Sequence, residues 1–531
     1  LNLRTTTITD EVKAPDGGTR RVVNDNETIA AQAKQLEIKQ KFAEWVWKDE
    51  GRAATLIRIY NERFNAFRKR EFDGSHLVLP GMSADITLYQ HQKNSIWRCL
   101  QDRATLLAHC VGAGKTFTMI AAAMELKRLG LCHKSLIVVP NHLPAQWAAE
   151  AIRLYPNIRL LAPGKEHLTS SQRGELLSRI ATSDYDAIII PQTAFKMLTL
   201  NPETVRNYIQ HELDTLTGYL EDFESASGKN RRSIKEVQRA IKKLKARLDD
   251  TNQQIKRIAA DTITWDELGI DALFIDEFHC YKNLYCPTKM SRVAGLPNTD
   301  SQRAFDCFIK VRSVLENGGR VICATATPVS NTLAEVYVCQ KYLQLETLQQ
   351  LGLDHFDAWV QQFAETTQSL EMTPDGSGFR MNTRFNKFTN IPELSKLWQQ
   401  VLDVKSAAEL NLPRPKLKGG RPEIISVPAS DELKEYVHEL ARRVEAIKGR
   451  RVSPHIDNML KVTGDGRKAA LDIRLVKSDS PRPVQSKVMA LVDNIEQLYR
   501  EAQNTRGVQL VFLDVSTPKG RSDKVSELSS R

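Results

Sequence analysis

The stretch Ala108-His-Cys-Val-Gly-Ala-Gly-Lys-Thr116 decides the fold of this 531-residue chain, because it has the form of a phosphate-binding turn. The apolar stretch Thr105–Leu107 precedes it, and a helix-forming run, Phe117–Met124, follows it. Backbone N–H groups of a glycine-rich turn at the start of a helix suit phosphate oxygens. The sequence therefore predicts a nucleoside triphosphate site between a buried strand and a helix.

Two side chains of this turn have expected roles. Lys115 can reach the β and γ phosphates, and the Thr116 hydroxyl can ligate Mg²⁺. His109 stands where the usual pattern has its first glycine. Taken alone, the altered pattern also fits an ordinary glycine-rich helix cap. The residues expected to hold the nucleotide, taken to be ATP, are Gly112, Ala113, Gly114, Lys115 and Thr116.

The composition limits the class of protein. At about 150 residues per domain, a chain of this length suggests several units. No apolar run is long enough to cross a membrane, so no membrane partner is expected. The net charge of +11 fits either a polyanionic partner or a solvated basic surface. The eight cysteines form no C-x-x-C pair, which favours a reduced, cytoplasmic setting without a cysteine metal site.

Short apolar runs rich in β-branched residues recur after residue 81. Continuous runs of this kind are typical of strands buried on both faces of a parallel sheet, with helices on both sides. We therefore expect an α/β fold whose ligands bind at the carboxyl ends of the strands. The predicted strands are Leu106–Ala108, Ser135–Val139, Ala187–Ile190, Ala272–Ile275 and Arg320–Ala324.

Polar side chains follow the last two of these strands. Asp276 and Glu277 come directly after one, where the first would organise Mg²⁺ and the second would polarise the attacking water. A solvated turn at a strand end is the alternative reading of this acidic pair. Thr325 and Thr327 follow the other strand, and we expect their hydroxyls to link the γ-phosphate site to a nucleic-acid track.

Three further motifs suggest contacts with a base and with nucleic acid. Gln92, one helix before the phosphate turn, has an amide that can pair with adenine. Asn141 and His142 follow the second strand, and Gln192 and Thr193 follow the third. Backbone amides and hydroxyls at such helix starts suit a phosphodiester backbone without reading bases. DNA bound in this way would show strong salt dependence and weak sequence preference.

A heptad-like pattern interrupts the strands between residues 200 and 262 and predicts an antiparallel helical hairpin. Its basic residues either touch DNA or form a solvated face. The chain is expected to divide as follows: 1–80, a polar extended segment and then a helical layer packed on the body; 81–345, the first lobe; 346–412, a helical extension; 413–423, a basic linker; 424–531, an incomplete second α/β lobe with strands at Ile424–Val427 and Gln509–Leu513.

The order of these motifs resembles that of superfamily 2 helicases and translocases. Ala108–Thr116 is similar to the Ala-Asp-Glu-x-Gly-x-Gly-Lys-Thr loop of Swi/Snf-type ATPases, with His109 and Cys110 in place of the acidic pair. An unrelated P-loop kinase would not show the motifs in this order. The residues that match functional positions of the family are Gln92, Lys115, Thr116, Asp276, Glu277, His279, Thr325 and Thr327.

Flanking stretches resemble the helicase part of DarB-like antirestriction proteins, in which a DNA adenine methylase region is often fused upstream. Those stretches are Tyr60–Phe64, Phe72–His76, Ile137–His142, Lys289–Gly295, Ala324–Asn331 and Asp465–Leu471.

The resemblance implies two RecA-like lobes, ATP hydrolysis with Mg²⁺ and movement along duplex DNA. It also implies association with a methylase region and with the remainder of a second lobe. The family's Gln-x-x-Gly-Arg-x-x-Arg motif does not occur, and neither Arg521 nor Arg531 lies in such a pattern. Because loss of an arginine finger lowers turnover by about 10³ to 10⁵, a nucleotide- and DNA-binding module without autonomous ATPase activity is the alternative expectation.

Overall fold

The structure is a computed structural model. It describes residues 8–13, 19–65, 70–169, 171–225, 231–255, 263–288, 290, 293–294, 296, 301–372, 379–411, 417–449, 451–453, 455–481 and 486–512. The chain separates into two compact units. The first comprises residues 1–370 and 381–413, and the second comprises residues 371–380 and 414–531.

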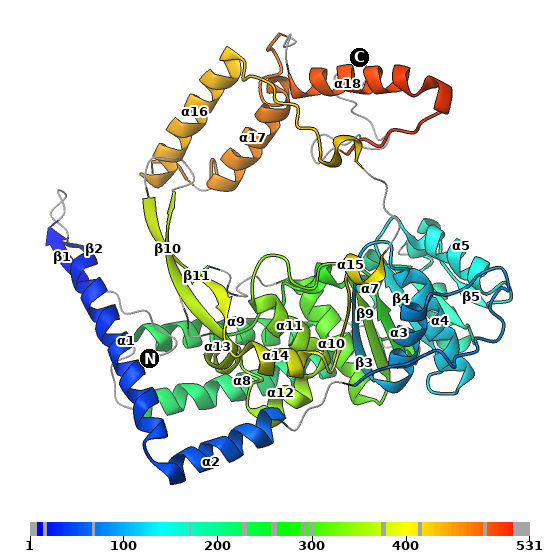
Figure 1. The fold of residues 1–531 in the computed structure, drawn as a ribbon, viewed down its shortest axis with the longest axis horizontal. Helices are drawn as coiled ribbons and strands as arrows, with labels where there is room; N and C mark the ends of the chain where they lie inside the picture. The colour runs from blue at the N-terminus through cyan, green and yellow to red at the C-terminus, as the bar shows by residue number, and fades with distance from the viewer. Residues whose placement is uncertain are drawn as a thin grey trace. The chain divides into compact units, whose positions relative to one another are not determined.

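A seven-stranded parallel sheet forms the centre of the first unit, in the order β12-β3-β9-β7-β4-β6-β5 (Figure 1). All five strands predicted from apolar runs are present, and the predicted α/β, RecA-like fold is confirmed. One strand, β9, separates the strand of the phosphate turn from the strand of the acidic pair. The strands are β3 Ala104–His109, β4 Ser135–Val139, β5 Leu160–Leu161, β6 Ala187–Pro191, β7 Ala272–Ile275, β9 Arg320–Ala324 and β12 Leu402–Lys405.

Helices cover both faces of this sheet, which explains why its strands are continuously apolar. In β4, Leu136 and Val138 join one buried layer, whereas Ile137 and Val139 join the other. Figure 1 shows α3 and α4 on one side of the strands and α10 on the other. The covering helices are α3 Gln90–Gln101, α4 Lys115–Arg128, α5 Pro144–Leu154, α6 Arg173–Thr182, α7 Gln192–Met197, α10 Gln302–Glu316 and α11 Ala334–Leu343.

The helical hairpin between the third and fourth predicted strands is confirmed. Helices α8 (Pro202–Ser225) and α9 (Arg231–Ile255) pack side by side (Figure 1). Lys341 of α11 forms a buried ion pair with Glu212 of α8, with 3.1 Å between Nζ and Oε1. Arg247 of α9 stacks over the ring of Phe305, 4.1 Å from its centroid. Part of the basic face therefore packs against the body of the unit.

The N-terminal segment differs from the expectation of an extended chain followed by a packed helical layer. Strands β1 (Thr9–Lys13) and β2 (Thr19–Val23) pair antiparallel, and α1 Asp25–Trp47, α2 Glu50–Tyr60 and the π-helix η1 Asn61–Asn65 follow. In α1, Leu36, Phe42 and Trp45 are 59%, 60% and 51% exposed. At 100° per residue, Leu36 lies opposite Trp45, so these apolar side chains do not form one stripe that a core could bury.

Residues 346–412 are not a purely helical extension, so that expectation is wrong. Strand β12 joins the sheet at its edge beside β3, and β10 and β11 belong to a second sheet with β8. Only four residues long, β12 leaves Val404 half exposed, so it lacks the continuous apolar run of a central strand. The elements are α12 Leu345–Leu351, α13 Phe356–Phe363, β8 Val293–Ala294, β10 Ala364–Met372, β11 Phe379–Phe388, α14 Ile391–Trp398 and α15 Ala407–Leu410.

The second unit contains α16 Asp431–Lys448, α17 Met459–Leu471 and α18 Lys487–Glu501, and α16 and α18 lie where helices were predicted. No strand occurs at 424–427 or within 509–512, so both strand predictions are wrong over the described residues. Ile424 is 86% exposed and lacks the partner strand that would bury it. None of the helices described in either unit is long and apolar enough to cross a membrane.

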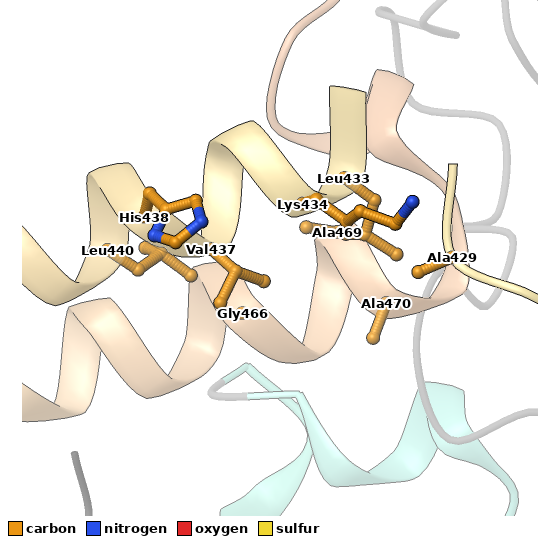
Figure 2. A pocket seen from close by; sticks show the side chains of 9 residues that line it. All are labelled: Ala429, Leu433, Lys434, Val437, His438, Leu440, Gly466, Ala469 and Ala470. Carbon is orange, nitrogen blue, oxygen red and sulfur yellow. The ribbon is translucent and has the colours of Figure 1, made fainter. Parts of the chain in front are cut away.

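An apolar groove of about 280 Å³ runs along α16 and α17 (Figure 2). Gly466 and Ala469 of α17 are small, which leaves space opposite the larger side chains of α16. The lining residues are Ala429, Leu433, Lys434, Val437, His438, Leu440, Gly466, Ala469 and Ala470.

Candidate nucleotide and nucleic-acid site

The predicted phosphate turn lies between β3 and α4, as the sequence indicates. Gly112 and Gly114 have φ angles of 85° and 77°, which side chains with a Cβ rarely adopt. A Cβ at Gly114 would also collide with the side-chain amide of Gln92. Helix α4 begins at Lys115, so its first backbone N–H groups adjoin the turn. This arrangement provides the anion site that a helix start and a glycine turn form together.

The lysine of the turn lies folded against the turn itself. Its Nζ donates to the carbonyl oxygens of His109 at 3.0 Å and Cys110 at 3.3 Å. Thr116, the second residue of α4, is half-buried. Thr118 donates its hydroxyl to the carbonyl oxygen of Gly114 at 3.2 Å and so holds the turn from the helix side. The lysine and threonine expected to meet phosphate and Mg²⁺ are therefore the first two residues of the helix that follows the turn.

Helix α3 holds the turn from its other side. The ring Nε2 of His91 lies 2.9 Å from the carbonyl oxygen of Ala113, and Gln92 Nε2 donates to that of Gly114 at 3.1 Å. The Gln92 Oε1 atom accepts from the backbone N–H of Tyr89 at 2.9 Å. One amide hydrogen and one lone pair of Gln92 remain for another partner. Contact between Gln92 and adenine thus stays a prediction.

The acidic pair follows β7. Asp276 is 7% exposed, and burial together with the neighbouring Glu277 carboxylate raises its pKa to about 6. The Lys115 ammonium acts in the opposite direction on the same pKa. Glu277 has a φ of 51°, a strained conformation for a residue other than glycine. Such strain is typical of functional sites.

A histidine joins the acidic pair to the next strand end. His279 Nδ1 lies 3.0 Å from Glu277 Oε2 and 3.1 Å from the hydroxyl of Thr325. Thr325 Oγ1 also accepts from the backbone N–H of Thr327 at 3.2 Å. Thr325 is buried, whereas Thr327 is exposed. The ends of β7 and β9 are therefore connected through His279 and Thr325.

Two charged residues without a sequence signal support the loop after β9. Lys282 Nζ lies 2.9 Å from Glu335 Oε1, and both side chains are largely buried. Glu335 Oε2 accepts from the backbone N–H groups of Ser330 at 2.7 Å and Asn331 at 3.4 Å. The sequence does not single out this pair, because its members lie 53 positions apart, one directly after the 3-10 helix Phe278–Tyr281 and the other in α11.

The residues predicted to face nucleic acid lie at the ends of β4 and β6, two paired strands. Asn141 Oδ1 accepts from the backbone N–H of Thr193 at 3.0 Å, so the two motifs are joined directly. Asn141, His142 and Thr193 are exposed, and Gln192 is buried. The surface carries polar groups suited to phosphate oxygens, on the same edge of the sheet as the phosphate turn.

The fold and this edge define a P-loop nucleotide-binding α/β protein. The chain belongs to the probable helicase domain family, whose model matches residues 97–406, more than half of the chain. Residues 1–66 match a second family, described as a domain of unknown function.

A similar solved structure is the Sulfolobus solfataricus SWI2/SNF2 ATPase core in complex with dsDNA, at 14% identity and a TM-score of 0.33. That similarity covers 81% of this chain and 67% of the other. No curated protein matches the chain.

Proposed function

We propose that the first unit binds ATP with Mg²⁺ and acts as the motor lobe of a DNA-dependent ATPase, a helicase-like translocase. The observation that carries this proposal is the set of contacts that joins Glu277 to His279 and His279 to Thr325, beside the turn that holds Lys115. A structural turn with solvated acids would need neither the buried, raised-pKa Asp276 nor the strained Glu277.

The side chains at this edge fit a nucleotide and its metal ion. The left-handed glycines 112 and 114 leave backbone N–H groups free of Cβ crowding, and Lys115 brings a positive charge. Thr116 and Asp276 offer a hydroxyl and a carboxylate, the oxygen ligands that Mg²⁺ prefers. Bound Mg²⁺ would neutralise charge on the phosphates.

Glu277 is the group proposed to orient and deprotonate the attacking water. His279 holds the Glu277 carboxylate by a contact of 3.0 Å, which fixes its orientation. Thr325 shares that histidine, so a change at the DNA-facing loop after β9 can alter the position of the glutamate. This is how we propose that DNA stimulates hydrolysis.

Duplex DNA is proposed to lie along the ends of β4, β6 and β9. Asn141, His142, Gln192, Thr193 and Thr327 would contact its phosphate backbone rather than its bases. A larger protein for DNA methylation, restriction or antirestriction is the proposed setting, with a methylase region and the remainder of a second lobe as partners.

A second candidate function is a nucleotide- and DNA-binding module whose hydrolysis depends on a partner lobe. The second unit favours it, because its residues described between 417 and 512 form helices without a strand, whereas a RecA-like lobe needs a sheet.

ATP hydrolysis by the chain, measured with and without duplex DNA, tests the motor proposal. The wild-type chain should hydrolyse ATP faster with DNA, and Glu277→Gln should abolish the stimulated rate while leaving ATP binding intact. A separately expressed second lobe that is needed for any turnover would support the module instead. Both candidates would be contradicted if ATP were hydrolysed neither by the chain alone nor by the chain mixed with the second lobe, and if Lys115→Ala bound ATP as tightly as the wild type.

A further inference from the structure

Strand β3, which ends in the phosphate turn, pairs with its two neighbouring strands over different lengths. Strand β9 pairs with β3 only as far as Leu107, whose carbonyl oxygen accepts from the N–H of Thr325 at 3.1 Å. Strand β12 continues to His109, which pairs with Lys405, and the Lys405 carbonyl oxygen accepts from the N–H of Cys110 at 2.9 Å. Among the described strands, β12 alone borders the last residues before the turn.

A buried side-chain pair strengthens this border. The His109 ring is fully buried, and its Nε2 lies 3.0 Å from Oδ2 of Asp403 in β12. The same oxygen accepts from the Ser95 hydroxyl of α3 at 2.6 Å. Burial alone would raise the pKa of Asp403, but the hydrogen bond and charge of His109, with Ser95, lower it below its ordinary value. The carboxylate is therefore ionised at neutral pH and anchors the ring.

His109 also touches the lysine of the turn through its main chain. Its carbonyl oxygen accepts from Lys115 Nζ at 3.0 Å. One residue thus carries the anchor to β12 in its side chain and an acceptor for the lysine in its backbone. A glycine at this position, as in the usual phosphate-turn pattern, would keep the acceptor and lose the anchor.

Helix α3 forms hydrogen bonds both to β12 with the residues just before it and to the phosphate turn. Arg98 donates to the carbonyl oxygens of Gln399, Gln400 and Leu402, each at 2.8 Å. Ser95 and Arg98 lie three positions apart and share one face of the helix with His91, which binds the turn. The position of β12 is therefore fixed relative to the turn by a single rigid element.

We infer that His109 and Asp403 are positioning residues of the nucleotide site: the pair fixes the carbonyl that holds Lys115 and thereby sets where the lysine meets the phosphates. The inference rests on the proposed binding of ATP. It assigns a role in nucleotide affinity to an aspartate 294 positions from the histidine it holds, in a strand whose sequence has no nucleotide-binding pattern.

Calorimetric titration of the full chain with Mg-ATP tests this in a double-mutant cycle. His109→Ala and Asp403→Asn should each weaken ATP binding by about tenfold, the usual effect of removing a group that orients a ligand-binding residue. The double variant should bind ATP no more weakly than either single variant, because each of the three variants removes the same contact between His109 and Asp403. Thr105→Val is the matched control, since this buried hydroxyl of β3 has no hydrogen-bond partner and lies away from the turn. Its affinity should stay at the wild-type value.

Thermal unfolding of each variant separates positioning from a purely structural role. Variants that melt earlier but bind Mg-ATP as the wild type does would overturn the inference, as would losses that add in the double variant. If Asp403→Asn does not fold, Ser95→Ala removes the second donor to Asp403, together with the hydroxyl contact to the His91 carbonyl oxygen at 2.9 Å, and leaves the His109–Asp403 pair in place. It should give a smaller loss in the same direction. A wild-type chain that binds no Mg-ATP would overturn the proposed function as well, whereas wild-type binding with unchanged variants overturns the inference alone.

Discussion

Replacing Asp276 by asparagine is expected to stabilise the nucleotide-free protein while impairing its site. The pKa of this carboxyl group rises from 3.8 to about 6 on folding, because it is buried beside Glu277. A shift of about two pKa units corresponds to about 3 kcal/mol by which the folded state disfavours the charged form at neutral pH. Asparagine has the same shape and no charge, so it removes this cost.

The sign of the effect fixes its pH dependence. Since the folded pKa lies above the unfolded one, the cost is absent below about pH 4, grows between pH 4 and 6, and is complete above that range. Linkage gives about 3 kcal/mol at pH 7.5 and about 1 kcal/mol at pH 4.5. In thermal unfolding with EDTA and without nucleotide, Asp276→Asn should therefore melt above the wild type at pH 7.5, with a smaller gap at pH 4.5.

Asp186→Asn is a control of opposite sign. Burial raises the pKa of Asp186, but hydrogen bonds from Arg159 and Lys127 outweigh burial and lower it, so the charged form is favoured on folding. Its asparagine variant should melt below the wild type at pH 7.5. An Asp276→Asn variant that is no more stable at pH 7.5, or whose gain is equal at both pH values, would refute the reasoning.

Three further outcomes are expected. Glu277→Gly should relieve the strain of a left-handed backbone conformation and raise the free energy of unfolding by about 1 kcal/mol. The same change should lower steady-state ATP hydrolysis by roughly 10²- to 10⁴-fold. Unchanged hydrolysis would exclude this glutamate as the base. Lys341→Met should cost about 3 to 5 kcal/mol in urea unfolding, because it leaves Glu212 buried without its partner. Burial raises the pKa of Glu212, but Lys341 and Tyr208 lower it overall, so the stability from this pair should fade as pH drops below about 4.5; a pH-independent difference would contradict that origin. Affinity for duplex DNA should fall steeply between about 50 and 200 mM salt, and Asn141→Ala should weaken binding equally on unrelated sequences, whereas a sequence-dependent loss would indicate base contacts.

The parts of the fold that the sequence predicts are those specified by local pattern. Ile188 to Ile190 lies in a strand buried on both faces, which leaves a continuous β-branched run that needs no knowledge of its neighbours. The hairpin of α8 and α9 is visible because Ile209 and Leu213 recur at helical spacing. The glycines of the turn can be recognised in the sequence from their spacing to Lys115.

The parts that escaped prediction depend on contacts between distant segments. Asp403 lies in a four-residue edge strand, and nothing in that strand indicates that it meets His109. Trp45 is of a residue type that is usually buried, but it is 51% exposed because the apolar residues of α1 are spread around the helix. The contacts of Gln92 with Tyr89 and with the turn likewise have no signal in the sequence, and its predicted contact with adenine stays a prediction.

Binding of Mg-ATP to the phosphate turn is the claim on which the rest depends, and calorimetric titration of the wild-type chain beside Lys115→Ala measures it directly. We expect the wild-type chain to bind one Mg-ATP. The variant should bind at least roughly tenfold more weakly, since charge-assisted hydrogen bonds to phosphate contribute about 1.5 to 3 kcal/mol. Equal affinities, or no binding by the wild type, would contradict a nucleotide site at the end of β3.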